Sequence, residues 1–167
     1  MGKLIANTNQ DIIDINLSEI QSKRFRIDGD DNRILTLNTT DLGILSRLKE
    51  AYPKLISFTS EAVKKLPEEL PELNENESLL ETEAVSDIIS VLKEIDANMR
   101  EQIDYIFDSN VSEICAPSGS MFDPINGKFR YEHIIDKLSV LYSDDISNGM
   151  NKISTRVRKH TDKYIGK

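Results

Sequence analysis

The sequence predicts an α+β fold, mostly helical, in which an N-terminal β-hairpin or small antiparallel sheet packs on three to four helices. Two short alternating segments before residue 40, apolar residues at helical spacing after it, and the overall composition support this prediction. Of the 167 residues, 38% are hydrophobic, 30% are charged and 6% are aromatic. Such a mixture suits helices with one buried and one solvated face, and the length suits a single domain over residues 1–167.

The hairpin is expected within residues 1–40, around an acidic turn. Arg24–Ile27 and Ile34–Leu37 alternate polar and apolar side chains on either side of Asp28–Asn32. Residues 12–17 could add a third strand. A two-stranded ribbon is marginal alone, so it must pack on the helices. The residues expected on its apolar side are Phe25, Ile27, Leu35 and Leu37.

The helical core is expected over residues 41–108, and its first helix follows the capping segment Thr39–Asp41. Because proline removes a backbone donor and clashes with the preceding turn, Pro53 predicts either a kink near Ala51 or two shorter helices. An acidic, proline-containing linker follows at residues 67–76. The residues expected on one stripe of the first helix are Leu45, Leu48, Tyr52, Leu55, Ala62, Val63 and Leu66.

A longer second helix is expected from about Leu79 to Phe107, because Ser78–Glu81 matches a capping box. Its apolar stripe consists of Val85, Ile88, Ile89, Leu92, Ile95, Met99, Ile103 and Ile106. Burial of this stripe against the first helix and the hairpin would contribute roughly 1.5–3 kcal/mol per fully buried large side chain.

Residues 109–130 are expected to form a loop with Asn126–Gly127 at the apex of a turn, and the sequence does not explain its length. A C-terminal helical region with a basic tail follows at residues 131–167. Its first apolar patch is Ile134, Ile135, Leu138 and Leu141. Beyond Gly149 the apolar series is Met150, Ile153, Val157 and Tyr164. Packing of this series on the protein's own core is our first reading, and docking on a partner as an amphipathic helix is the alternative.

The net charge of -8 disfavours binding to nucleic acid or to an anionic membrane surface, since both depend on basic residues. Charge is uneven, however, because residues 61–87 are strongly acidic. The last sixteen residues carry one acid, Asp162, and the bases Lys152, Arg156, Arg158, Lys159, Lys163 and Lys167. The basic tail could be a contact surface, or cations favourably placed near a helix C-terminus. The candidate partner-binding residues are Met150, Ile153, Val157, Arg158, Lys159 and Tyr164.

No residue pattern indicates catalysis, a metal or a cofactor. Asp28–Asn32 resembles the start of a calcium loop, but Arg33 and Thr39 stand where that loop needs glycine and glutamate. Cys115 and the two histidines have neither zinc-ligand spacing nor a nucleophile–base pattern. A single cysteine and the lack of an apolar leader or membrane-spanning run predict a cytoplasmic protein.

Several different short motifs are spread over most of the chain, from about Ser18 to Tyr164. These motifs are Lys23–Asp30, Leu37–Asp41, Ile103–Asp108, Pro124–Lys128 and Tyr131–Glu132. Together they resemble the tail assembly chaperones of long-tailed phages and prophages of Gram-positive bacteria. The resemblance implies a homo-oligomer in the bacterial host cytoplasm that binds the tape measure protein, helps recruit tail tube protein and leaves the finished virion. It supplies no catalytic residue.

Two other protein classes remain open. One is a structural subunit of the phage virion, such as a tail or connector component, whose hairpin would extend a neighbour's sheet. The other is a small acidic inhibitor of a host nucleic-acid-binding protein, which the acidic stretch Glu61–Asp87 would serve by mimicking phosphate charge.

Overall fold

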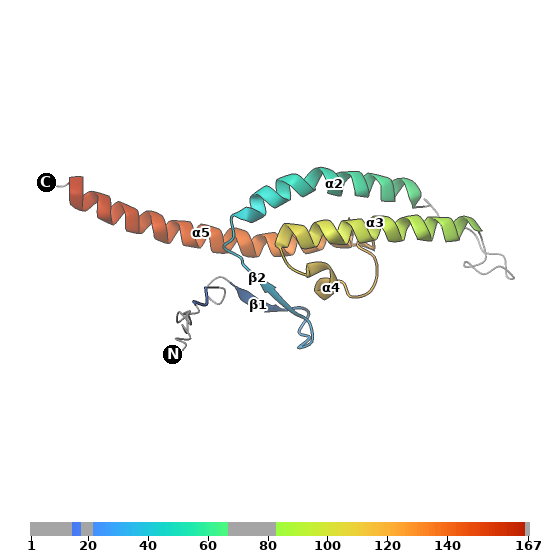
Figure 1. Cartoon of the computed structure of the whole chain (residues 1–167), viewed down its shortest axis with the longest axis horizontal. Helices are drawn as coiled ribbons and strands as arrows, with labels where there is room; N and C mark the ends of the chain where they lie inside the picture. Colours follow the sequence, from blue (N-terminus) through green and yellow to red (C-terminus); the bar gives the residue numbers. More distant parts are fainter. Residues whose placement is uncertain (1–14, 18–21, 67–82, 166–167) are drawn as a thin grey trace, which may run out of the picture.

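The computed structural model describes residues 15–17, 22–66 and 83–165. Its elements are β1 (Lys23–Arg26), β2 (Ile34–Leu37), α2 (Gly43–Lys65), α3 (Glu83–Phe107), α4 (Val111–Cys115), β3 (Pro124–Ile125), β4 (Lys128–Phe129) and α5 (Arg130–Ile165). Figure 1 shows α2 and α3 side by side, with the β1–β2 hairpin below them and α5 extending well past both. The predicted α+β class, mostly helical, is confirmed.

The β1–β2 hairpin is confirmed with its predicted apolar side: β2 has the predicted bounds, and β1 lies one residue earlier than predicted. The strands are antiparallel, with Phe25 opposite Leu35 and Lys23 opposite Leu37. Leu35 and Leu37 are buried, while Phe25 and Ile27 are partly buried against the core. Of the proposed third strand only residues 15–17 are described, and they are not in a strand.

The turn between β1 and β2 is closed by ion pairs within the hairpin. Asp28 and Gly29 adopt positive φ angles of 52° and 74°, which reverse the chain. The Asp28 carboxylate accepts a hydrogen bond from Arg33 at 2.9 Å, and Asp31 pairs with Arg26 at the same distance. These acids therefore have basic partners in the hairpin, as expected of a plain turn.

Helix α2 runs through Pro53 without a break, so the alternative of two shorter helices is wrong. Figure 1 shows one bowed helix. The N-cap residue is Leu42, which makes no side-chain cap hydrogen bond, so the N-cap predicted within Thr39–Asp41 is wrong by one residue. The carboxylate of Asp41 nevertheless accepts the backbone N–H of Gly43 at 2.8 Å.

The predicted stripe of α2 proves to mix two faces of the helix. The residues buried against the core are Ile44, Ala51, Leu55 and Ala62. Leu45, Tyr52 and Val63, which were expected on the same stripe, are instead exposed. Consecutive helical residues lie about 100° apart, so two parallel apolar series one residue out of step look like one series in the sequence.

Helix α3 supplies the centre of the core, as predicted. Its buried residues are Ile95, Met99, Ile103, Ile106 and Phe107. Of the predicted stripe, Ile88 and Leu92 are half-buried, and Ile89 is exposed, which contradicts its predicted place on the buried side. The predicted linker at residues 67–76, the capping box at Ser78–Glu81 and the side chain of Val85 lie outside the described residues.

The segment between α3 and α5 folds back onto the core, which accounts for its length. It contains α4 and the short β3–β4 hairpin, and it buries Val111, Ala116, Met121 and Phe122. Asn126 and Gly127 have positive φ angles of 50° and 79°, so the predicted turn is confirmed between β3 and β4.

Charged side chains from neighbouring elements hold this segment in place. The guanidinium of Arg33 in the hairpin donates to the carbonyls of Ile114 and Cys115 at 2.9 and 2.8 Å. From α3, the Asp96 carboxylate accepts hydrogen bonds from the Ser120 hydroxyl at 2.8 Å and from the Met121 backbone N–H. These contacts satisfy backbone groups that a helix end or loop would otherwise leave unpaired.

The first half of α5 packs against the rest of the protein, where Tyr131, Leu138 and Tyr142 are buried. Asp145 marks the end of this packed half, because its carboxylate pairs with Lys23 of β1 at 2.5 Å and accepts a hydrogen bond from Thr39. We call this half of α5, together with the other described elements, the body. Among the described helices, none is both long enough and apolar enough to cross a bilayer.

Candidate protein-binding surface

The second half of α5 projects from the body, and we call residues 150–165 the α5 arm. Figure 1 shows it running beyond α2 and α3 toward the C-terminus. Every side chain from Met150 to Asp162 is exposed, including Met150 at 49%, Ile153 at 45% and Val157 at 55%. Our first reading, that this apolar series packs on the protein's own core, is therefore wrong for Met150, Ile153 and Val157. Tyr164 belongs to α5, but its side chain lies outside the described residues.

The apolar face of the arm continues the face by which α5 packs on the body. Tyr142 and Ile146 lie on that face, the first buried and the second half-buried. Met150, Ile153 and Val157 follow at steps of four, three and four residues, which keeps them in line along the helix. One continuous stripe is thus packed in its first part and, as far as the described residues go, uncovered in its second.

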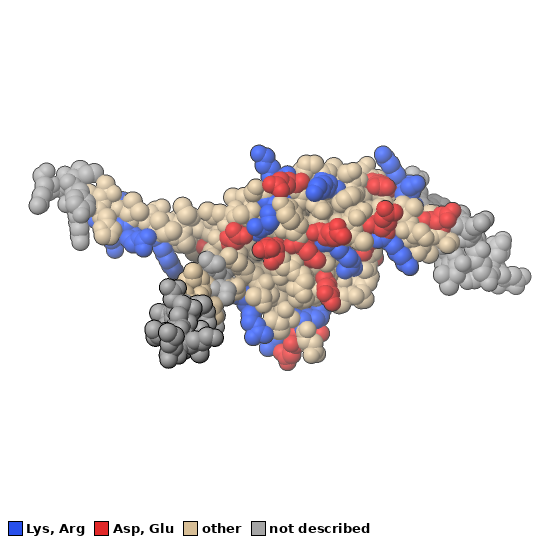
Figure 2. Space-filling model, viewed as in Figure 1, with Lys and Arg blue, Asp and Glu red and all other residues tan. Residues whose placement is uncertain are grey.

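The basic candidates Arg158 and Lys159 are also exposed on the arm. Lys152 and Arg156 lie on one flank of the apolar face and Arg158 lies on the other, as helical spacing dictates. Within the described part of the chain, none of these four arm residues forms an ion pair with an acidic side chain. Figure 2 shows basic side chains on the arm and most of the visible acidic ones over the body.

The arm receives no packing from the described body. Most of the stability of protein helices comes from burial of an amphipathic face. An uncovered apolar face with basic flanks therefore has the properties of a helix that is completed by a partner.

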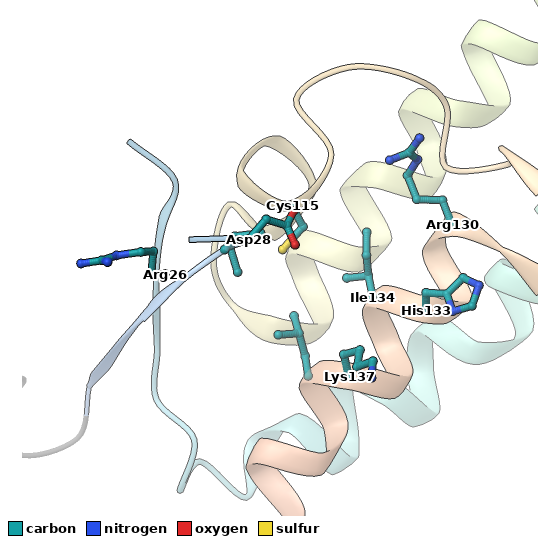
Figure 3. Close-up of a pocket in the computed structure, with 9 residues that line it drawn as sticks. Arg26, Asp28, Cys115, Arg130, His133, Ile134 and Lys137 are labelled. Carbon is teal, nitrogen blue, oxygen red and sulfur yellow. The ribbon is translucent and has the colours of Figure 1, made fainter. Parts of the chain in front are cut away.

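Cys115 and His133, the residues considered for nucleophilic chemistry, line one cavity of about 280 Å³. Burial raises the pKa of the Cys115 thiol, which disfavours the thiolate that acts as a nucleophile. The His133 Nε2 lies 2.8 Å from the Ile125 carbonyl oxygen, and Figure 3 shows its ring turned away from Cys115. The structure thus brings the two residues to one cavity without the geometry of a catalytic dyad.

The raised thiol pKa gives a direct prediction for Cys115. We expect iodoacetamide to alkylate Cys115 at pH 7.5 at least about tenfold more slowly in the native protein than in urea, because the thiol is partly buried and burial raises its pKa above that of the unfolded chain. Mass spectrometry of timed samples measures both rates, with free N-acetylcysteine as the control. Equal rates in native and unfolded protein would contradict this environment.

In the described residues, no group of His, Cys, Asp or Glu side chains is placed to hold a metal ion. The sequence alone indicated the α5 arm as a candidate contact surface, because its apolar residues have regular helical spacing. The exposed face of α2 was missed because its residues interleave with the buried ones.

The chain matches none of the protein families, curated proteins or solved structures with which it was compared.

Proposed function

We propose that the protein is a non-catalytic assembly chaperone that binds an apolar helical segment of another protein. Its sequence motifs point to the phage tail assembly class, in which the partner is the tape measure protein and the result is tail tube assembly in the cytoplasm of the bacterial host. The observation that carries this proposal is the uncovered apolar face of the α5 arm, formed by Met150, Ile153 and Val157.

The physical basis is complementarity between apolar helical faces. A long helical protein awaiting assembly exposes apolar stripes that promote aggregation, and a second helix laid along such a stripe removes both faces from water. The strongly negative net charge of -8 would keep the complex soluble, while the basic arm marks the place of contact.

Co-expression with the neighbouring genes tests the proposal. We expect the protein to co-purify with the tape measure protein, to keep it soluble, and to be absent from purified particles. Recovery of the protein from particles would assign it to the virion as a structural subunit. Failure both to bind and to solubilise the tape measure protein would remove the chaperone proposal.

Removal of residues 150–167 should separate folding from binding. We expect the shortened protein to unfold cooperatively with a free energy within about 1 kcal/mol of the full chain, because the described side chains removed are all exposed. It should no longer retain the partner. Urea denaturation and co-purification measure the two properties, and loss of cooperative unfolding would instead place the arm in the folding core.

A further inference from the structure

We infer that α2 and α5 form a groove for an acidic amphipathic helix of a different protein, and that this groove leads directly onto the α5 arm. The inference deepens the proposed function, on which it rests for the biological role of the partner. The geometry and charge of the groove stand independently of that role.

One wall of the groove is an apolar line along α2 that the core does not use. Its members are Leu45 (63% exposed), Tyr52 (59%), Ile56 (50%) and Val63 (54%). They are seven, four and seven residues apart, the spacing that places side chains on one side of a helix and is typical of coiled-coil contacts. We call these four residues the α2 stripe.

The other wall comes from α5. A cavity of about 270 Å³ lies between the two helices, lined by Leu45 and Leu48 of α2 and by Ser139, Ser143 and Ile146 of α5. The two serines are one turn apart and short, so they leave room for an incoming helix to approach closely.

Helices α2 and α5 run antiparallel, and the groove follows both. Leu45, near the start of α2, shares the cavity with Ile146 of α5. Further along α2, the hydroxyl of Thr59 lies 2.7 Å from that of Tyr131, near the start of α5. The α2 stripe therefore follows the first half of α5 for most of its length.

Ile146 connects the groove to the arm, because it lines the cavity and also belongs to the apolar face that continues through Met150, Ile153 and Val157. From Tyr131 to Val157 the groove and arm follow about 26 helical residues, or about 39 Å at 1.5 Å per residue. A single straight partner helix of that length could contact the α2 stripe and the arm together.

The basic residues beside the groove and on the arm determine which kind of partner helix can bind. Lys49 lies between Leu45 and Tyr52 along α2, and Lys64 follows Val63. Both are exposed, and neither has an ion-pair partner among the described residues. The arm adds Lys152, Arg156 and Arg158 around its apolar face. A partner with acidic flanks is attracted to such a surface, whereas the basic arm of a second copy is repelled.

Two designed peptides test the chemistry of the occupant. Each has four heptads with leucine at the a and d positions, and the e and g positions are all glutamate in one and all lysine in the other. In fluorescence anisotropy with the full chain, we expect at least tenfold tighter binding of the glutamate peptide, weakening as salt is raised. Equal binding of both peptides, or binding of neither, would overturn the inference.

Matched variants test the location. Ile56→Ser in the α2 stripe and Val157→Ser in the arm should each weaken binding of the glutamate peptide at least tenfold. The controls Lys54→Ser and Asn151→Ser lie on the same helices outside the apolar faces and are exposed, so they should change binding less than threefold. Unchanged binding by Ile56→Ser, with helicity and melting temperature as in the parent, would remove α2 from the surface.

Two further outcomes separate this inference from the proposed function. If the glutamate peptide binds through both helices but the tape measure protein does not co-purify, the groove remains and the chaperone role fails. If the tape measure protein co-purifies equally well with Ile56→Ser, the chaperone role remains and the groove fails. A dimer in sedimentation that Ile56→Ser dissociates would identify the occupant as a second copy and overturn the inference.

Discussion

Leu35→Ala is expected to lower the free energy of unfolding by about 2–5 kcal/mol, the usual cost of removing a fully buried leucine side chain. Leu35 lies in β2 opposite Phe25, and its side chain is completely buried in the core. Its truncation leaves a cavity at the contact between the hairpin and the helices. Urea denaturation followed by circular dichroism at 222 nm measures the loss.

Thr36→Ala is the matched control, because Thr36 is the next residue of β2 and its side chain is exposed on the opposite side of the ribbon. Its effect should stay within about 1 kcal/mol, the span of strand propensities. Similar small effects from both substitutions would show that the hairpin is not packed on the helices as described.

Arg100→Ala is expected to cost at least about 2 kcal/mol, because one guanidinium supports several backbone carbonyls. Arg100 pairs with Asp96 at 2.7 Å and donates to the carbonyl oxygens of Ser112, Ala116 and Gly119 at 3.2, 2.9 and 2.8 Å. Its loss removes this donor from the carbonyls of Ala116 and Gly119, while the Ser112 carbonyl still accepts the backbone N–H of Ala116. The segment between α3 and α5 is therefore held less firmly. Limited proteolysis within residues 116–120 should therefore accelerate together with the loss of stability.

Arg100→Lys and Lys93→Ala are the controls for this prediction. Lysine keeps the charge but cannot reproduce the planar arrangement of donors, so Arg100→Lys should recover only part of the stability. Lys93 is exposed on the same helix, and its replacement should change stability by no more than about 0.5 kcal/mol. Equal stability of Arg100→Ala and Lys93→Ala would show that these hydrogen bonds do not hold the segment.

The sequence predicts the hairpin and α3 well because each has a single strong periodicity. Alternation on both sides of Asp28–Asn32 determines which side of the ribbon is apolar, and the spacing from Ile95 to Ile106 determines the buried side of α3. Over these residues each element has one apolar face, so pattern and burial agree, whereas Ile89 earlier in α3 is exposed.

The other elements depend on tertiary contacts that periodicity does not encode. Helix α2 has apolar residues on two adjacent faces, and only its packing against α3 shows which face is buried. The role of Arg100 depends on carbonyls of residues that lie 12 to 19 positions away, which no local pattern relates to it. The arm shows the same limit, since an apolar series has the same spacing whether it meets the core or a partner.

The single helix α5 also has a mechanical consequence. It is fixed to the body through Tyr142 and Asp145 and then continues unbroken into the arm. A force applied to the arm is therefore transmitted along the helix to the body, as by a lever. Gly149 sits at the base of this lever, and glycine weakens a helix interior by about 0.5–1 kcal/mol relative to alanine. Bending is therefore easiest at that turn, where a small change in angle sweeps the far end through a wide arc while both halves of the helix stay intact.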